Sequence, residues 1–348
     1  MPNKLKVPPN AGVDISRRTA FQLAITATVA LTSPHIYAAS GAKTINWSFM
    51  HHLPATHPVA KLYSAFVSEV LKATNGRLRI KLYALGELPF EESQTLEAFQ
   101  TGTVQMAEGL QGSLAPQLPA LGLSGEPFLA TNHEETMIMV KTMEPYLRKQ
   151  LSPFGVELLT VLDKGYQSFF GNGAPMSSPG DLKGRRVRTA GRQIAEVVTL
   201  FGGQAMQIPL GDVPSALGTG VVHTYITTPV SALGQGWGDF TTWTYVANIA
   251  PAPIFLLVSQ GALAALPADV KASLLSVTDT FTVQASKQLL ADHENALHAL
   301  QKNAKTNTTA TDAQLAEFVA KCKPAWLQWG KEHKLEELVN MVANQLHK

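Results

Sequence analysis

The stretch DLKGRRVRTAG at residues 181–191 holds three arginines, Arg185, Arg186 and Arg188, the densest basic cluster beyond residue 40. If RRVRT forms a strand, Arg186 and Arg188 point to one face of the sheet and Val187 to the other. A guanidinium group is planar and permanently charged, and it offers two parallel donors to a carboxylate. The segment therefore predicts either a carboxylate clamp or three solvated arginines near a turn.

Position and composition favour a clamp built on one arginine. Arg188 stands at the carboxyl end of the expected strand, and ligands of open α/β sheets bind at that end of the strands. The whole chain of 348 residues carries a net charge of only +2. Because proteins that bind nucleic acid are usually far more basic, we expect no nucleic-acid partner.

Histidines form the best candidate for a metal site. His51, His52 and His57 lie at the end of an expected strand and in the loop after it. Three histidines can bind zinc, but no acidic residue beside them completes the set, so we favour a polar, pocket-lining role for His51 or His52. His293 and His298 are five residues apart, which places them on different faces of a helix.

Sequence motifs of common enzymes are absent. The chain has no G-x-x-x-x-G-K phosphate loop and no G-x-S-x-G nucleophile turn. The glycine-rich segment 234–238, GQGWG, lacks the strand–turn–helix context of a dinucleotide site and is expected to be a loop. The single cysteine, Cys322, permits neither an internal disulfide nor a cysteine metal cluster. We therefore expect no cofactor and no metal.

Alternating strands and helices must position Arg188. In the first half we expect strands at 44–51, 77–84, 104–109 and 156–163, and helices at 58–74, 91–101 and about 133–150. The same pattern restarts after Asp163, with strands near 166–170, 185–189, 204–208 and 221–226 and a helix at 192–201. This order predicts an α/β protein with largely parallel sheets.

The last third of the sequence is expected to be helical. A helix that begins at Pro267 can run to about residue 304, which is roughly 55 Å at 1.5 Å per residue. A helix of that length would brace two domains. Two or three further helices are expected within residues 312–345.

The N-terminus has the features of an export signal at residues 1–39. Basic residues precede an apolar run of about 14 residues, which is too short to span a bilayer. Residues 16–21, SRRTAF, resemble a twin-arginine signal, although Ala20 interrupts the usual pattern. General secretion or a retained anchor remain alternatives. We expect the mature protein in the periplasm.

Five blocks of sequence resemble one family, the substrate-binding subunits of tripartite ATP-independent periplasmic (TRAP) transporters, or DctP family. The blocks are ATNGRLRIKLYALGEL at 73–88, LEAFQTGTVQMAEG at 96–109, EPFLA at 126–130, SSPGDLKGRRVRT at 177–189, and GGQAMQIPLGDVPSALGTGVV at 202–222. Their order and spacing extend the resemblance over about residues 43–345.

The resemblance implies a two-lobed periplasmic binding protein fold, in which a long helix bridges both lobes. Lobe I would comprise 43–165 and about 254–293, and lobe II 166–253 and about 294–348. Arg188 matches the arginine that binds the ligand carboxylate in this family. By position, the other candidate ligand-binding residues are His52, Leu110, Gln111, Ser113, Phe128, Gln167, Leu210, Thr227, Trp237 and Phe240.

Departures from the family pattern narrow the range of ligands that we expect. Gln167 replaces the second arginine of sialic-acid-type members, His223 replaces a usual Asp, and Asp212 replaces a usual Glu. The pocket thus loses donors and keeps apolar and aromatic bulk: Trp47, Phe128, Tyr166, Leu210, Tyr225, Trp237, Phe240 and Trp243. One clamp beside an apolar wall favours a small monocarboxylate, such as an aromatic or branched 2-oxo or 2-hydroxy acid.

The resemblance implies a non-catalytic protein that captures a small organic acid and delivers it to the TRAP membrane permease. The same trap could instead present an acid to a membrane sensor kinase, and the sequence does not separate these two roles. A secreted enzyme is the third alternative, which the missing catalytic motifs disfavour. The sequence leaves the oligomeric state open.

Overall fold

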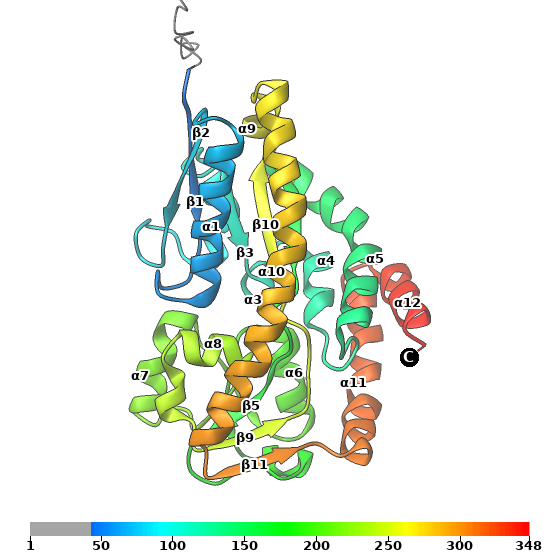
Figure 1. Cartoon of the computed structure of the whole chain (residues 1–348). Coiled ribbons are helices and arrows are strands. Elements are labelled where there is room, and N and C mark those ends of the chain that lie inside the picture. Colours follow the sequence, from blue (N-terminus) through cyan, green and yellow to red (C-terminus); the bar gives the residue numbers. More distant parts are fainter. Residues whose placement is uncertain (1–42, 348) are drawn as a thin grey trace, which may run out of the picture. The chain divides into compact units, whose positions relative to one another are not determined.

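The structure, a computed structural model, describes residues 43–347, so the export signal expected at residues 1–39 lies outside the described residues. The described chain builds two β-sheets, one of five strands and one of six, and helices pack on both (Figure 1). We call the parts built on them the first and the second lobe. This is the two-lobed α/β fold that the resemblance implied. No helix among residues 43–347 is long and apolar enough to cross a membrane.

The five-stranded sheet of the first lobe has the order β2-β1-β3-β10-β4. Its neighbours β1, β2 and β3 are parallel, whereas β10 runs antiparallel to β3 and to β4. The carboxyl ends of β1, β3 and β4 therefore share one edge with the start of β10. The strands are β1 (Ile45–Met50), β2 (Leu78–Tyr83), β3 (Met106–Gly109), β4 (Val156–Leu162) and β10 (Ile254–Ser259).

The six-stranded sheet of the second lobe has the order β11-β9-β5-β8-β6-β7. Here β5 alone runs antiparallel to both neighbours, β8 and β9. The carboxyl ends of β6 and β8 thus share an edge with the start of β5. The strands are β5 (Ser168–Gly171), β6 (Arg186–Thr189), β7 (Gln204–Gln207), β8 (Thr224–Thr227), β9 (Trp243–Val246) and β11 (Thr306–Thr309).

Each sheet contains one antiparallel strand, which the expectation of largely parallel sheets did not include. Both antiparallel strands, β5 and β10, directly follow segments that cross between the lobes. The two crossing segments pair with each other: Gln167 N donates to Ala250 O at 2.9 Å, and Ala252 N donates to Gly165 O at 2.9 Å. Because no helix reverses the chain at these crossings, the strand after each one runs against its neighbours.

Helix α1 (Pro58–Ala73) shows how local sequence sets an element. His57 caps the helix, since its Nδ1 accepts a hydrogen bond from Val59 N at 3.2 Å, and Pro58 fits the first turn. Buried apolar side chains at helical spacing, from Val59 to Val70, pack on the first sheet. Asn75 and Gly76, both at positive φ, end the helix.

The remaining helices of the two lobes are shorter, apart from α5. They are α2 (Thr95–Gln100), α3 (Gln111–Leu114), α4 (Pro119–Gly122), α5 (His133–Leu151), α6 (Arg192–Leu200), α7 (Val213–Gly218), α8 (Pro229–Gly234) and α9 (Gln260–Ala264). Short 3₁₀ turns include 92–94, 210–212 and 237–240.

Helix α10 (Ala268–Asn303) is the long helix that the sequence predicts. Its 36 residues span about 54 Å. It packs on α1 and β4 in the first lobe and on α8 and β9 in the second, as Figure 1 shows. Leu274 and Leu289 enter the core of the first lobe, and Leu300 enters that of the second.

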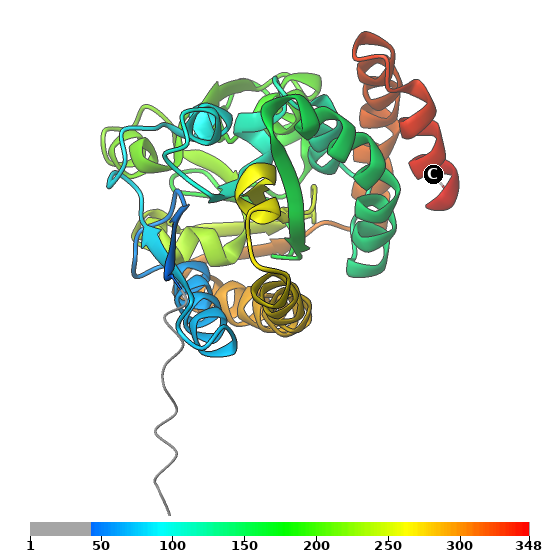
Figure 2. The same ribbon diagram turned by 90° about the horizontal axis from the view of Figure 1, so that it is seen from above.

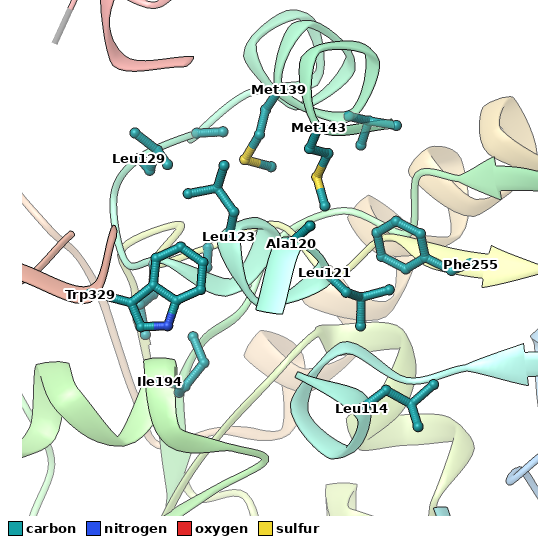
Figure 3. Packing of buried hydrophobic residues seen from close by; sticks show 14 of the residues in the cluster. Leu114, Ala120, Leu121, Leu123, Leu129, Met139, Met143, Ile194, Phe255 and Trp329 are labelled. Atoms are coloured by element: carbon teal, nitrogen blue, oxygen red, sulfur yellow. The ribbon is translucent and has the colours of Figure 1, made fainter. Parts of the chain in front are cut away.

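The C-terminal helices α11 (Asp312–Glu332) and α12 (Glu336–Gln345) connect both lobes from the outside. Helix α11 packs on α6 of the second lobe. Helix α12, red in Figure 2, packs on α5 of the first lobe. Met139 and Met143 point from α5 toward the leucines of the α4 region, and Trp329 lies beside Ile194 (Figure 3). The largest apolar core is therefore continuous from one lobe to the other.

Candidate ligand-binding site

A cavity of about 80 Å³ lies between the two lobes, where the carboxyl edges of the two sheets meet. This is several times the 10–15 Å³ or so that one water molecule requires. The first lobe and the crossing segments contribute Leu53, Glu92, Leu110, Gln111, Gly112, Ser113, Lys164, Ala252 and Pro253. The second lobe contributes Gln167, Arg188, Ala190, Leu210, Thr227, Thr228 and Ser231. The location matches the rule that open α/β sheets bind ligands at their carboxyl edges.

Arg188 is the dominant charge of the second-lobe wall. Its side chain is 1% exposed; Nε donates to Ile208 O at 2.9 Å, and Nη1 donates to Ile226 O at 3.4 Å. The Trp237 ring lies beneath it, with its centroid 5.1 Å from Cζ. Nη2 donates to no protein group among the described residues. Burial lowers the pKa of the guanidinium to about 10, which still leaves it charged at neutral pH.

The two neighbouring arginines of the cluster have structural roles instead. Arg185 donates to Ala174 O at 2.7 Å and lies over the Trp243 ring. Arg186 is exposed and donates to Gly220 O at 3.0 Å. Of the three arginines, Arg188 alone lines the cavity. The clamp alternative therefore applies to Arg188 and not to its two neighbours.

Two charged residues of the cavity were not recognised in the sequence. Glu92 accepts hydrogen bonds from Ser113 Oγ at 2.7 Å and from Leu210 N at 3.2 Å. Lys164 is 8% exposed, and burial lowers its pKa while Glu108 and Glu92 raise it. Lys164 lies two residues after the carboxyl end of β4, so the rule that led to Arg188 applies to it as well.

Seven residues proposed from the sequence line the cavity together: Arg188, Gln167, Thr227, Leu110, Gln111, Ser113 and Leu210. Four do not. His52 is buried behind the wall, with Nε2 3.2 Å from Thr95 Oγ1. Phe128 lies in the main core and stacks on Phe318, Trp237 lies beneath Arg188, and Phe240 is half-buried in the core of the second lobe.

The aromatic wall expected from the sequence is wrong for this cavity. Its apolar lining is aliphatic: Leu53, Leu110, Leu210, Ala190, Ala252 and Pro253. The aromatic candidates on strands, such as Trp47, Tyr225 and Trp243, are buried in the cores. Alternation along a strand shows which residues share a face, but not which face meets the ligand.

The three histidines near β1 are buried but do not form a metal site. Among residues 43–347 no group of three or more His, Cys, Asp or Glu residues is arranged to hold a metal ion. Burial lowers the pKa of His51 to about 4 and that of His57 to about 3. These two imidazoles are therefore neutral at physiological pH.

Close contacts join the lobes around the cavity. A Cβ added at Gly112 would lie 2.6 Å from Ala190 O, and one added at Gly191 would lie 2.7 Å from Gly112 Cα. Gln111 Nε2 also donates across the junction to Gln193 Oε1 at 3.3 Å. The glycine at 112 is thus required for the approach of the lobes seen here.

Comparisons with known proteins give a consistent result. Residues 49–332 match the model of a family described as bacterial extracellular solute-binding protein, family 7. The C4-dicarboxylate-binding periplasmic protein DctP of Rhodobacter capsulatus is 25% identical over 295 residues, 82% of this chain and 84% of that protein.

Solved structures show the same fold. DctP7 of Bordetella pertussis, an extracytoplasmic solute receptor binding pyroglutamic acid, superposes with a TM-score of 0.80 at 22% identity and covers 86% of this chain and 99% of its own. A TRAP periplasmic solute-binding protein of Chromohalobacter salexigens with bound D-glucuronate gives a TM-score of 0.78 at 20% identity, with the same coverage.

Proposed function

Because the chain belongs to the bacterial extracellular solute-binding proteins of family 7, we propose that it is the solute receptor of a TRAP transporter and binds a small organic acid between its lobes. The family consists of solute-binding proteins, which supports a non-catalytic role. The relatives above bind C4-dicarboxylates, pyroglutamic acid and D-glucuronate. We propose that the periplasm is its location and that membrane permease subunits are its partners.

The proposal depends on one observation, the environment of the Arg188 guanidinium. Its guanidinium is buried in the cavity and oriented by two backbone carbonyls, and Nη2 has no hydrogen-bond partner within residues 43–347. A carboxylate that accepts from Nη1 and Nη2 would supply the missing charge and the missing acceptors. Bidentate pairs of this kind are among the stronger hydrogen-bonded contacts in proteins.

The charge of the cavity favours a monocarboxylate. Arg188 and Lys164 contribute two positive charges and Glu92 one negative charge. Glu108 lies behind the wall, where burial raises its pKa to about 7. The wall thus carries an excess of about one positive charge, which a monoanion neutralises. The aliphatic lining is suited to a compact or branched body.

We propose that the ligand binds by hinge closure of the two lobes. The crossing segments and α10 connect the lobes, and the contacts of Gly112 and Gln111 form only when the lobes approach. Closure removes Arg188 and the carboxylate from water, which strengthens their attraction.

A thermal-shift screen against mono- and dicarboxylates, oxo acids and sugar acids tests the proposal. A ligand at a hundred times its Kd stabilises a protein by about 2.7 kcal/mol. Arg188→Ala should weaken binding by about 2–5 kcal/mol, and Arg188→Lys should also bind poorly because it loses the bidentate fork. Arg186→Ala, an exposed arginine on the same strand, is the matched control. Unchanged affinity in the Arg188 variants would refute the clamp.

A further inference from the structure

Lys164 is a second buried cation in the cavity, and the proposed clamp does not use it. Its side chain is 8% exposed and lines the cavity, and among residues 43–347 it forms no ion pair and no hydrogen bond through its ammonium group. Because the ammonium group faces the cavity, its three N–H donors are available to whatever fills the cavity, with no acceptor from the described protein.

The backbone around Lys164 is fixed. Asp163 accepts a hydrogen bond from Gly165 N at 2.9 Å, and its other oxygen lies 2.6 Å from His133 Nδ1. Gly165 has φ +84, and a Cβ there would lie 2.3 Å from His293 Nδ1. Lys164 thus extends into the cavity from a turn whose two flanking residues are held on either side.

A buried carboxylate supports the charge of Lys164 from outside the cavity. Glu108 on β3 is fully buried, does not line the cavity, and attracts the Lys164 ammonium. Glu92 attracts it from the cavity wall. Glu92 already receives two hydrogen bonds, from Ser113 and Leu210. Both acidic neighbours oppose the lowering of the Lys164 pKa by burial, and neither accepts a hydrogen bond from its ammonium group.

We propose that Lys164 is a specificity-determining residue that binds a second hydrogen-bond acceptor of the ligand, a carbonyl or hydroxyl oxygen carried beside the carboxylate. Arg188 is on the second-lobe wall and Lys164 on the crossing segment, so one small acid between them can engage both. The substrate class is then an oxo, hydroxy or lactam monocarboxylate rather than a simple fatty acid. This inference rests on the proposed function.

Matched pairs of acids test the inference by isothermal titration calorimetry on the purified protein. The pairs are pyroglutamate with cyclopentanecarboxylate, 2-oxoisovalerate with isovalerate, and lactate with propionate. We expect the acceptor-bearing acid of at least one pair to bind at least tenfold more tightly. Lys164→Met should reduce that ratio to within about threefold of unity and leave the affinity of the plain acid nearly unchanged.

Controls separate this inference from the proposed function. Lys61→Met removes an exposed lysine on α1 and should preserve the ratio. Lys164→Leu also removes the donors and serves as a second variant if the methionine variant does not fold, whereas Lys164→Arg keeps charge and donors and should preserve the preference. A preference that survives in Lys164→Met, or the absence of any preference in the unaltered protein, overturns the inference alone. Arg188→Ala binding both acids normally, or no acid binding at all, overturns the proposed function and the inference with it.

Discussion

The contact between Gly112 and the turn after β6 makes closure of the lobes testable with one methyl group. An alanine at 112 would place its Cβ 2.6 Å from Ala190 O. Such a clash exists only when the lobes meet as they do here. Overpacking of this kind costs about 1–3 kcal/mol. If that cost falls on the closed state alone, Gly112→Ala should bind its acid about 5- to 150-fold more weakly.

Calorimetry with the best acid from the thermal-shift screen would measure this loss. The ligand-free variant should be as stable as the parent or slightly more so, because replacing glycine with alanine restricts the unfolded chain. Gly191→Ala should weaken binding in the same way as Gly112→Ala, since its Cβ would lie 2.7 Å from Gly112 Cα. Gly261→Ala is the control, because no heavy atom lies within 4 Å of its added Cβ. Full affinity in both junction variants would refute the closure of the lobes onto this contact.

Two further predictions concern buried titrating groups. Burial holds the folded-state pKa of His57 at about 3, below its ordinary 6.5, so the unfolded chain binds more protons and stability is lost as the pH falls below 6.5. At pH 5 the free energy of unfolding is lowered by about 2 kcal/mol through this residue. His57→Asn keeps a capping acceptor but has no titrating imidazole, so its Tm should fall less between pH 7 and 5 than the Tm of the parent. An equal fall in both proteins would contradict the low pKa of His57. Burial raises the pKa of the Cys322 thiol to about 12, so the native protein should not react with a disulfide reagent at pH 8 until guanidinium unfolds it. Rapid labelling of the native protein would show that the thiol is accessible.

Local sequence signals predicted many of the elements closely. The helix expected at 58–74 is α1 at Pro58–Ala73, and the long helix expected from Pro267 to about 304 is α10 at Ala268–Asn303. Both have clear apolar periodicity or strong end signals. Strands β9, β10 and β11 were not predicted, because each is short or uniformly apolar or polar and takes its structure from neighbours distant in the sequence.

The site could be predicted only in part, for a similar reason. Arg188 has a distinctive type and a distinctive place at a strand end. Lys164 has the same two properties, but its single charge in the segment VLDKGY did not stand out as a cluster did. Phe128 and Trp237 could not be assigned to core or cavity, because that choice depends on how the two sheets face each other.

The crossings between the lobes decide how this protein can be divided. The chain passes from the first sheet to the second after β4, returns before β10, and passes again along α10 to β11. A single cut therefore releases neither lobe intact. Grafting one lobe onto a relative would need three junctions made in register, each through paired backbone or a continuous helix. Engineering a new solute preference is more practicable at single side chains of the cavity, where no junction has to be rebuilt.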